Sequence, residues 1–563
     1  MCGIAGIISK NKNVTLDKME KVLGTIAHRG PDGGGTYIRN NVGLGMNRLA
    51  IIDTEEHTIP FSNENGTLHL VYNGEIYNHD EICRKLKKKH TIKYNSDSET
   101  ILHAWEEYGL EIVKMFNGMY AFAVYDEKEG VLTLVRDKVG EKPLYYYFDG
   151  SELIFASEIK AIVKVVKPDI NQKALTYKTF EFCCGEETLF KNTYCLQPGE
   201  ALIYKNGGIT LKKYWKIYDN LIDVKDDEKQ IVEDLTELME DSILLRKKNN
   251  VHSFGCLVSG GVDSALVACI SKPDFIYTGT YDINESFNEL PYAQLVAKHI
   301  KKDMVVVKPQ KEDYLRYKDE ILYHLDMPCT WTSFNMFMVL KRAKEDIRVV
   351  LSGEGVDELF GGYHRYHLLD HDQKIFKLKA MEKYNYMIQK YYGTPESRYA
   401  KLINRNINQF DEDTSRYLHE LTTYYFSKTE SIIHGMGIVD FYTTMQVLLK
   451  MSDNMSMAFS IENRSPFLDY RLVQYAFSMP DKYKIKDGIT KYMIKKIAER
   501  FIPKEIADRV DKRGFAAPVN LWFDWRKNGQ YGREQYKESV YADWRKIFFK
   551  DADNNSDKIY YTN

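Results

Sequence analysis

The chain has 563 residues, which is too long for a single hydrophobic core and suggests two to four domains. Hydrophobic residues make up 44% and charged residues 28%, a composition that excludes a largely disordered or collagen-like protein. Lysine plus arginine number 78 against 80 aspartate plus glutamate, so the net charge of −2 gives no basic excess of the kind that marks a dedicated nucleic-acid-binding protein.

The eight cysteines contain no CxxC pair and no zinc-ligand spacing, which favours reduced thiols and predicts no structural metal. The start of the chain lacks the basic leader of a signal peptide. No stretch approaches the ~18 apolar residues of a membrane span. We therefore expect a cytoplasmic protein with no membrane or nucleic-acid partner.

The first part of the chain, residues 1–215, reads as short strands punctuated by Gly, Asn and Asp, as in NGMYAFAVYD, VLTLVRD and ELIFASE. Two helices are expected within it, Leu16 to Ala27 and Glu99 to Tyr108, the second with a cap beginning at Ser96. The pattern predicts a sheet-rich first domain.

The polar, acidic stretch from Tyr214 to Lys229 marks the predicted boundary, and residues 230–550 form the second domain. Strands such as GCLVS, FIYTGTYD and DMVVVK alternate there with helical runs such as DSALVACISK, PYAQLVAKHIKK and FNMFMVLKRAKED. This alternation predicts a parallel sheet covered by helices. From about Asp370 the chain reads as mostly helical, and Asn554 to Asn563 as a disordered tail.

A glycine-rich loop follows the first strand of the second domain and opens a helix. Its residues are Ser259, Gly260, Gly261, Val262, Asp263 and Ser264. Glycines allow close backbone approach to a phosphate, and the free N–H groups at a helix start point at it. Asp263 would repel a bare phosphate, so its presence predicts Mg²⁺ between the two.

A second glycine-rich string, residues 352–363, follows the strand RVVL. The carboxyl ends of parallel strands are where open α/β sheets bind ligands. Asp357 is expected to share the magnesium with Asp263, and Glu354 to act as a general base.

Cys2 has a special place in the chain. Removal of Met1 would leave its thiol beside a free α-amine with a pKa near 8, which can act as the base for that thiol. On its own, an inert buried cysteine is the more common reading of such a residue.

Cys2 lies in the first of five strings that occur in the order MCGIAG, HRGPD, RLAIID, NGEIYN and SD. Together they resemble a class II glutamine amidotransferase domain of the N-terminal nucleophile type. The SGGVDS loop looks like that of the ATP pyrophosphatases, which release AMP and pyrophosphate. With SGEGVDELFGGY as well, the whole chain resembles the glutamine-hydrolysing asparagine synthetases. The implied folds are a four-layer αββα sandwich and a parallel-sheet ATP-pyrophosphatase domain with helical additions.

The resemblance implies a role for each matching residue. Cys2 would attack the side-chain amide of glutamine, and the Asn73 amide with the Gly74 N–H would form the oxyanion hole. Arg48 would pair with the α-carboxylate of glutamine, and Glu75 and Asp97 would hold its α-ammonium group. In the second domain Leu257 and Gly353 would contact adenine, and Lys491 would bind the leaving pyrophosphate.

Three segments are harder to interpret. Residues 455–469 resemble the family's helical segment between the two sites, and their Met and aromatic side chains are either core or tunnel lining. Gly279 stands where the family has an apolar residue against the base. Asp326-Met327-Pro328 departs from an acidic-Pro pattern, with any effect expected on the acceptor.

The implied reaction converts L-aspartate to L-asparagine with MgATP and with ammonia from glutamine, in a homodimer. Three alternatives remain open. The acceptor could be another carboxylate, such as a sugar acid or a modified amino acid. An intramolecular amide former of the β-lactam synthetase type is disfavoured because Cys2 and Glu354 are both present. A nucleotide sensor or storage protein would not need Cys2 at the N-terminus.

Overall fold

The computed structural model describes most of the chain. The described residues are 1–52, 59–87, 89–90, 92–93, 96–177, 185–248, 252–283, 288–329, 331–366, 394–403, 412–509, 517–523 and 532–549. The predicted tail, Asn554 to Asn563, lies outside them.

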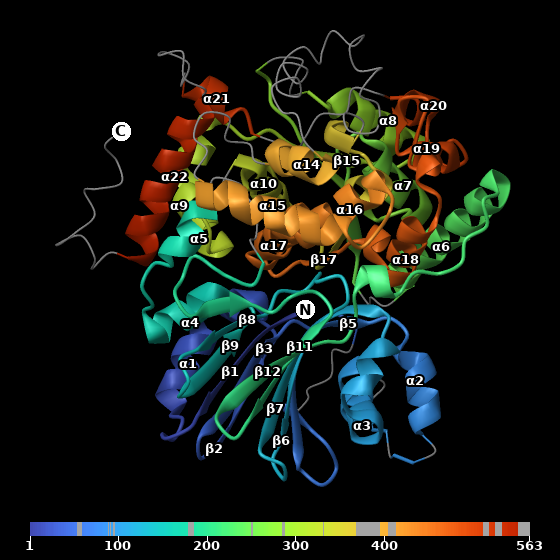
Figure 1. Cartoon of the computed structure of the whole chain (residues 1–563). Coiled ribbons are helices and arrows are strands. Elements are labelled where there is room, and N and C mark those ends of the chain that lie inside the picture. The colour runs from blue at the N-terminus through green and yellow to red at the C-terminus, as the bar shows by residue number, and fades with distance from the viewer. Residues whose placement is uncertain are drawn as a thin grey trace.

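Two six-stranded antiparallel sheets form the first part of the chain (Figure 1). The first has the order β10 (Thr193–Cys195), β8 (Tyr145–Phe148), β9 (Glu152–Ala156), β1 (Cys2–Ser9), β3 (Val42–Arg48) and β2 (Gly34–Arg39). The second has the order β12 (Gly208–Lys213), β11 (Glu200–Lys205), β7 (Val131–Arg136), β6 (Gly118–Asp126), β5 (Leu68–Ile76) and β4 (Phe61–Ser62).

The two sheets pack face to face through alternate apolar side chains, including Ile4, Val71, Leu134 and Phe155. Helices α1 (Leu16–Thr25) and α4 (Ile159–Val166) pack on the first sheet, and α3 (Asp97–Tyr108) packs on the second with α2 (His79–Leu86) beside it. The predicted four-layer sandwich is confirmed.

The first part contains more helix than the two segments expected. Helix α1 ends at Thr25 and α3 starts at Asp97, and α2, α4 and α5 (Gln172–Tyr177) are additional. Helix α2 buries His79, Ile82, Cys83 and Leu86. That spacing of three or four residues is helical, but eight residues give it too little length to stand out beside the turn-rich sequence around it.

The second part is built on a parallel sheet with the order β15 (Met304–Val307), β14 (Phe275–Gly279), β13 (Phe254–Leu257), β16 (Val349–Leu351) and β17 (Glu462–Arg464). Val349 and Leu351 enter one apolar core, and Val350 between them enters another on the opposite face. Both faces are therefore buried, as predicted, and the strands read as continuous apolar runs.

Helices cover both faces. They are α6 (Glu228–Lys248), α7 (Val262–Ser271), α8 (Leu290–Ile300), α9 (Lys311–Leu325), α10 (Trp331–Ala343) and α11 (Val356–Phe360). The later helices are α14 (Pro395–Ile403), α15 (Glu412–Phe426), α16 (Ile432–Tyr442), α17 (Thr444–Met457), α18 (Tyr470–Ser478), α19 (Tyr492–Ala498), α20 (Lys504–Ala507), α21 (Val519–Trp522) and α22 (Gly532–Phe548), with a small hairpin of β18 (Ile485–Lys486) and β19 (Ile489–Thr490).

The segment expected to be helical between the sites is only partly so. Helix α17 ends at Met457, and Glu462–Arg464 is the edge strand of the parallel sheet. Met455 and Met457 are fully buried in the two cores of this part, so the core interpretation holds for them. The helical stretch Ile432–Met457 is long and apolar enough to cross a membrane, but 78% of its most apolar 18-residue segment is buried inside the protein.

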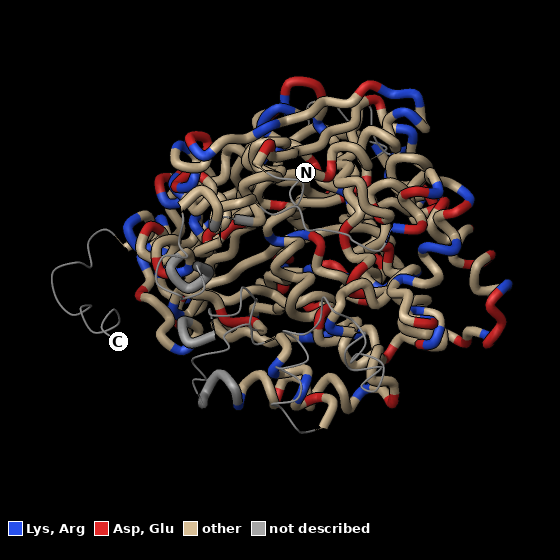
Figure 2. The backbone as a smooth tube through the Cα atoms, turned by 90° about the horizontal axis from the view of Figure 1, so that it is seen from above, with Lys and Arg blue, Asp and Glu red and all other residues tan. Residues whose placement is uncertain are grey.

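Charged side chains join the two parts of the chain. The fully buried Arg29 guanidinium lies 2.8 Å from Glu158 of its own part and 2.8 Å from Asp453 on α17. The buried Asp326 carboxylate accepts a hydrogen bond from the Ile159 N–H at 2.7 Å and lies 3.3 Å from Lys160. Asp326 therefore caps the start of α4 across the interface, and the expected link to the acceptor has no support from its contacts. Over the whole backbone, acidic and basic residues are interspersed (Figure 2).

Replacing Arg29 by Met should destabilise the protein by about 3–5 kcal/mol, because two buried carboxylates each lose one cationic partner, and the contact across the interface is lost. The free energy of the first urea unfolding transition at pH 7 measures this loss. Arg39→Met is the matched control, since Arg39 pairs with Glu127 at the surface with 58% of its side chain exposed, and an exposed pair contributes about 0–1 kcal/mol. Equal effects of the two changes would contradict the role of Arg29.

Candidate active sites

Cys2 begins β1, directly opposite Arg48 at the end of β3. Only 7% of Cys2 is exposed. Burial raises the pKa of its thiol, although the N-terminal ammonium of Met1 and the Arg48 guanidinium act in the opposite direction. In this state the thiol favours its neutral form, so activation requires a base close to the sulfur.

Asn73 and Gly74 lie on β5 beside Cys2. The Cys2 N–H donates to Asn73 Oδ1 at 2.9 Å. Among the described residues, the buried Asn73 Nδ2 has no hydrogen-bond partner, which leaves a donor available to a ligand. A side chain at Gly74 would place its Cβ 2.2 Å from the Met119 carbonyl oxygen on β6, so the close strand pairing there requires glycine.

The residues expected to bind glutamine share one pocket with Cys2, which we call the Cys2 pocket. It is lined by Met1, Cys2, Met46, Arg48, Leu49, Ala50, Ile51, Ile52, Phe61, Tyr72, Gly74, Glu75, Ser96, Asp97, Ser98 and Glu462. Asp97 at the start of α3 accepts from the Tyr72 hydroxyl at 2.6 Å and from the Ile76 N–H at 3.1 Å. The structure thus brings Cys2, Arg48, Gly74, Glu75 and Asp97 together, with Asn73 hydrogen-bonded to Cys2 beside them.

Glu462 is a pocket residue that the sequence reasoning missed. It comes from β17 in the second part of the chain, and its carboxylate forms an ion pair with the Met1 α-ammonium group at 2.8 Å. Arg464 lies 2.6 Å from Glu462 and 3.7 Å from Glu75. Burial would raise the pKa of Glu462, but the Met1 ammonium and Arg464 lower it to about 2. No local pattern marks a residue 460 positions from Cys2 as its neighbour.

The glycine-rich loop lies between β13 and α7. The Ser259 N–H donates to Ser264 Oγ at 3.1 Å, and Gly260 has a φ of +74°, a conformation that favours glycine. Arg509 donates to the Gly260 carbonyl at 3.2 Å and forms two short contacts with Glu289, at 2.8 and 2.6 Å. These contacts hold the loop in a fixed conformation at the start of α7.

Asp263 and Asp357 converge on one cation. Lys491 Nζ lies 2.7 Å from Asp263 and 2.6 Å from Asp357. Gly362 lies beside them, since a Cβ there would come 2.0 Å from Asp357 Oδ1 and 2.1 Å from Lys491 Cε. The two predicted metal ligands are thus adjacent, with the predicted pyrophosphate-binding lysine between them.

Gly353 lies two residues after β16 and packs closely on this loop, because a Cβ there would lie 2.7–3.0 Å from Asp263 and Ser264 atoms. Leu257 is the last residue of the neighbouring strand β13. At Gly279 a Cβ would come 2.1 Å from Asn335 Oδ1, so the Asn335 side chain takes up the space that an apolar side chain would need.

Glu354 faces a different pocket, between the two parts of the chain. This Glu354 pocket is lined by Glu141, Lys142, Glu354, Leu449, Ser452, Asp453, Asn463 and Ser465. Ser465 Oγ lies 3.2 Å from the Glu354 carboxylate. Burial raises the pKa of Glu354 to about 7, against the opposing effect of its serine, lysine and asparagine neighbours. A carboxylate with that pKa is suited to accept a proton near neutral pH.

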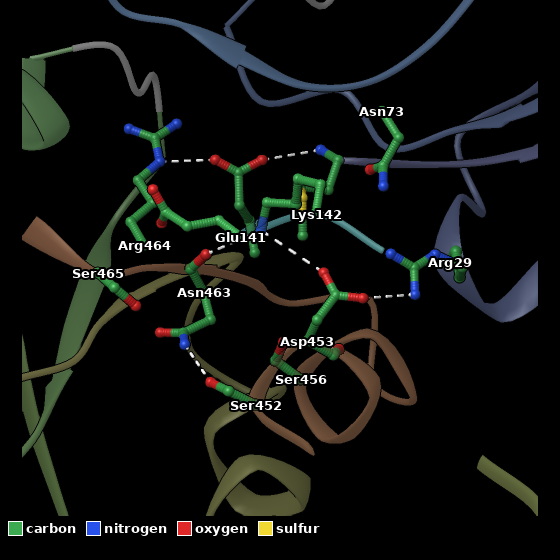
Figure 3. Close-up of polar contacts among 12 residues, drawn as sticks. Arg29, Asn73, Glu141, Lys142, Ser452, Asp453, Ser456, Asn463, Arg464 and Ser465 are labelled. Atoms are coloured by element: carbon green, nitrogen blue, oxygen red, sulfur yellow. Dashed lines mark hydrogen bonds and ion pairs between the residues drawn. The ribbon is translucent and has the colours of Figure 1, made fainter. Parts of the chain in front are cut away.

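Residues of one short strand, β17, line both pockets. Glu462 lines the Cys2 pocket, and Asn463 lines the Glu354 pocket together with Ser465, which directly follows the strand. Lys142 from the first part lies 3.5 Å from Asp453 and donates to the Asn463 carbonyl at 3.2 Å (Figure 3). Strand β17 and its neighbours therefore connect the two pockets structurally.

Comparison with known proteins matches both parts of the chain. Residues 1–215 match the glutamine amidotransferase domain, and residues 234–552 match asparagine synthase. Asparagine synthetase [glutamine-hydrolyzing] 1 of Bacillus subtilis is 31% identical over 94% of this chain and 89% of its own length. Asparagine synthetase [glutamine-hydrolyzing] 3 of the same organism is 28% identical over 89% and 84%. A putative asparagine synthetase 2 of Methanocaldococcus jannaschii is 33% identical over 64% and 76%.

These matches agree with the geometry, since the amidotransferase match covers the Cys2 pocket's β1, β3 and β5 and the synthase match covers the glycine-rich loop, Lys491 and β17. The chain belongs to the family of glutamine-hydrolysing asparagine synthetases.

Proposed function

We propose that this enzyme converts L-aspartate to L-asparagine, using ammonia released from glutamine and energy from ATP cleaved to AMP and pyrophosphate. Residues 1–215 would form the glutaminase domain and 230–550 the synthetase domain. The observation that carries the proposal is β17, which supplies Glu462 to the Cys2 pocket and Asn463 to the Glu354 pocket. An enzyme that makes ammonia in one site and consumes it in another needs a structural connection between the two sites, and β17 contributes to both.

In the glutaminase site, Cys2 attacks the side-chain carbonyl carbon of glutamine after Met1 has been removed and its own α-amine has taken the thiol proton. Asn73 Nδ2 and the Gly74 N–H then stabilise the oxyanion. Arg48 holds the α-carboxylate of glutamine, and Glu75 and Asp97 hold the α-ammonium. The intermediate expels ammonia, and water releases glutamate from the thioester.

In the synthetase site, the side-chain carboxylate of aspartate attacks the α-phosphorus of ATP, which gives an acyl-adenylate and pyrophosphate. The loop from Ser259 to Ser264 binds the phosphates, and Leu257 and Gly353 contact adenine. Asp263 and Asp357 fit a Mg²⁺ ion, since both carboxylates already hold one cation at 2.6–2.7 Å. Mg²⁺ would neutralise phosphate charge there, with Lys491 turning to the pyrophosphate.

Ammonia then attacks the acyl carbon of the adenylate, Glu354 accepts the proton, and AMP leaves. A path past Asn463 that is enclosed by the protein would keep the ammonia away from bulk water, where at neutral pH it would become ammonium and lose its nucleophilicity. The protein is proposed to work in the cytoplasm as a homodimer, with small molecules as its substrates.

Glu354→Gln should lower glutamine-dependent synthesis by roughly 10²–10⁴-fold, the usual contribution of a general base, while glutaminase activity stays within a few-fold. In the wild type the ionised base is the active form. Because the pKa of Glu354 is raised to about 7, synthesis per glutamine hydrolysed should rise between pH 6 and 8. Glu141→Gln in the same pocket is the matched control. A greater loss from Glu141→Gln would reassign the base.

The acceptor is tested directly by incubating the enzyme with ATP, Mg²⁺, glutamine and a panel of carboxylates, and measuring AMP and the amide product together. Aspartate should give asparagine and AMP in equal amounts. AMP release that rises only with a sugar acid or a modified amino acid would move the protein to that alternative, with both catalytic sites retained.

A further inference from the structure

A cluster of four metal-ligand side chains lies outside both active sites, at the far edge of the second sheet. Glu64 is in the turn between β4 and β5, His90 follows α2, and His103 and Glu106 lie on one face of α3. Helices α2 and α3 pack side by side (Figure 1). One ligand atom from each of the four side chains lies within 4.8 Å of all the others.

The spacing of these atoms fits a tetrahedral ion. His90 Nδ1 lies 3.6 Å from Glu106 and 3.9 Å from Glu64, and His103 Nδ1 lies 3.2 Å from Glu106 and 3.5 Å from Glu64. Zinc bonds to nitrogen and oxygen of about 2.0–2.2 Å would put neighbouring ligand atoms about 3.4 Å apart. The two distances to Glu64 run to different oxygens of its carboxylate. With one ligand atom per side chain, three of the six tetrahedral edges, at 3.2–3.6 Å, already have nearly the right length.

The Nε2 atoms of both rings, which face away from the cluster, each lie near a further carboxylate. His90 Nε2 lies 3.2 Å from Glu107, and His103 Nε2 lies 3.7 Å from Glu99. Asn63 Nδ2 donates to the outer oxygen of Glu106 at 2.6 Å. Metal-binding histidines commonly carry such a carboxylate on the nitrogen that faces away from the metal, which fixes the ring and its tautomer. Both imidazoles here have Nδ1 turned inward. The Nε2 of His90 is hydrogen-bonded to Glu107, and the Nε2 of His103 has the Glu99 carboxylate nearby at 3.7 Å.

We propose that Glu64, His90, His103 and Glu106 form a binding site for Zn²⁺ or a similar borderline divalent cation. Imidazole nitrogen suits zinc and its neighbours, whereas Mg²⁺ and Ca²⁺ prefer oxygen ligands alone. A second group of possible ligands, His28, Glu158 and His324, is not suited to bind a cation. Arg29 and Lys160 already contact its carboxylate, and their positive charges oppose a cation.

The site would fasten His90 and α3 to Glu64 in the β4–β5 turn. Helix α3 starts at Asp97, which lines the Cys2 pocket. Metal loading should therefore lower the KM for glutamine more than it changes kcat. This consequence rests on the proposed function, whereas metal binding itself does not.

The test uses the full-length chain carrying Cys2→Ala, because the free thiol would itself bind metal. The protein, without an affinity tag, is stripped with a chelator and titrated with Co²⁺ and then Zn²⁺. We expect one ion per chain, the intense visible absorption of tetrahedral Co²⁺, and its displacement by Zn²⁺ but not by excess Mg²⁺.

His90→Gln and His103→Gln should each weaken Zn²⁺ binding by more than 100-fold, and Glu107→Gln by roughly 10–100-fold. The exposed His299 on α8 gives the matched control, since His299→Gln should leave binding unchanged. Circular dichroism verifies the fold of each variant, and the half-buried His90 is the safer of the two ligands to change. Failure to bind one ion per chain, or binding that both histidine variants retain, would overturn the proposal and leave a proton-bridged His–Glu cluster.

Discussion

Cys2→Ala should lower glutamine-dependent asparagine formation by at least ~10⁴-fold, the scale on which losing a catalytic nucleophile reduces turnover. Glutamine hydrolysis should fall equally. Synthesis from a high concentration of ammonium salt at raised pH should stay within a few-fold of the wild type. The physical reason is spatial: Cys2 starts β1 of the sandwich, whereas the ATP loop follows β13 of the parallel sheet. Steady-state assays of glutamate, asparagine and AMP measure all three rates.

Cys83→Ala is the matched control, because Cys83 is equally buried but lies on α2, outside the lining of the Cys2 pocket. It should leave all three rates nearly unchanged. Intact-mass analysis should show the wild-type chain without Met1. Glutaminase activity retained by Cys2→Ala would disprove the nucleophile, and loss of ammonia-driven synthesis by a folded variant would disprove the separation of the sites. A retained Met1 would favour the sensor interpretation.

Asp263→Asn and Asp357→Asn should each lower ATP turnover by roughly 10²–10³-fold, the size of losing one preorganised electrostatic contact in a desolvated site. Each change removes a negative charge that would face Mg²⁺ and that now faces Lys491. Basal glutamine hydrolysis, measured without ATP and aspartate, should remain largely intact. The measurement is AMP and pyrophosphate release as a function of Mg²⁺ concentration.

Asp282→Asn provides the control for charge removal alone, since Asp282 is exposed and pairs with Lys308 at the surface. Its AMP release should equal that of the wild type. Normal AMP release by Asp263→Asn or Asp357→Asn would show that the substituted residue is not a metal ligand. A steep rise of the variant's activity at high Mg²⁺ concentration would support weakened metal binding.

Much of the fold could be predicted from local pattern. Continuous apolar runs before SGGVDS and SGEGVD predicted parallel strands, and the structure has them as β13 and β16, with both faces buried. Short elements were harder, as α2 and α4 show, because one or two turns of helix give little periodicity. Strand β17 could not be predicted, because three residues, Glu462–Arg464, pair only with a strand more than one hundred positions earlier.

By itself the sequence determined the two kinds of site: a cysteine beside the N-terminus with its ordered strings, and two glycine-rich strand ends carrying Asp263, Glu354 and Asp357. These are local patterns, because backbone conformation and the order of donors along a loop depend on adjacent residues. Only the tertiary structure decided which distant residues contact one another. Glu462 contacts the Met1 amine, Arg29 contacts Asp453, and His90 lies near His103 and Glu64, because strand pairing and helix packing bring distant segments together. No spacing rule along the chain encodes those distances.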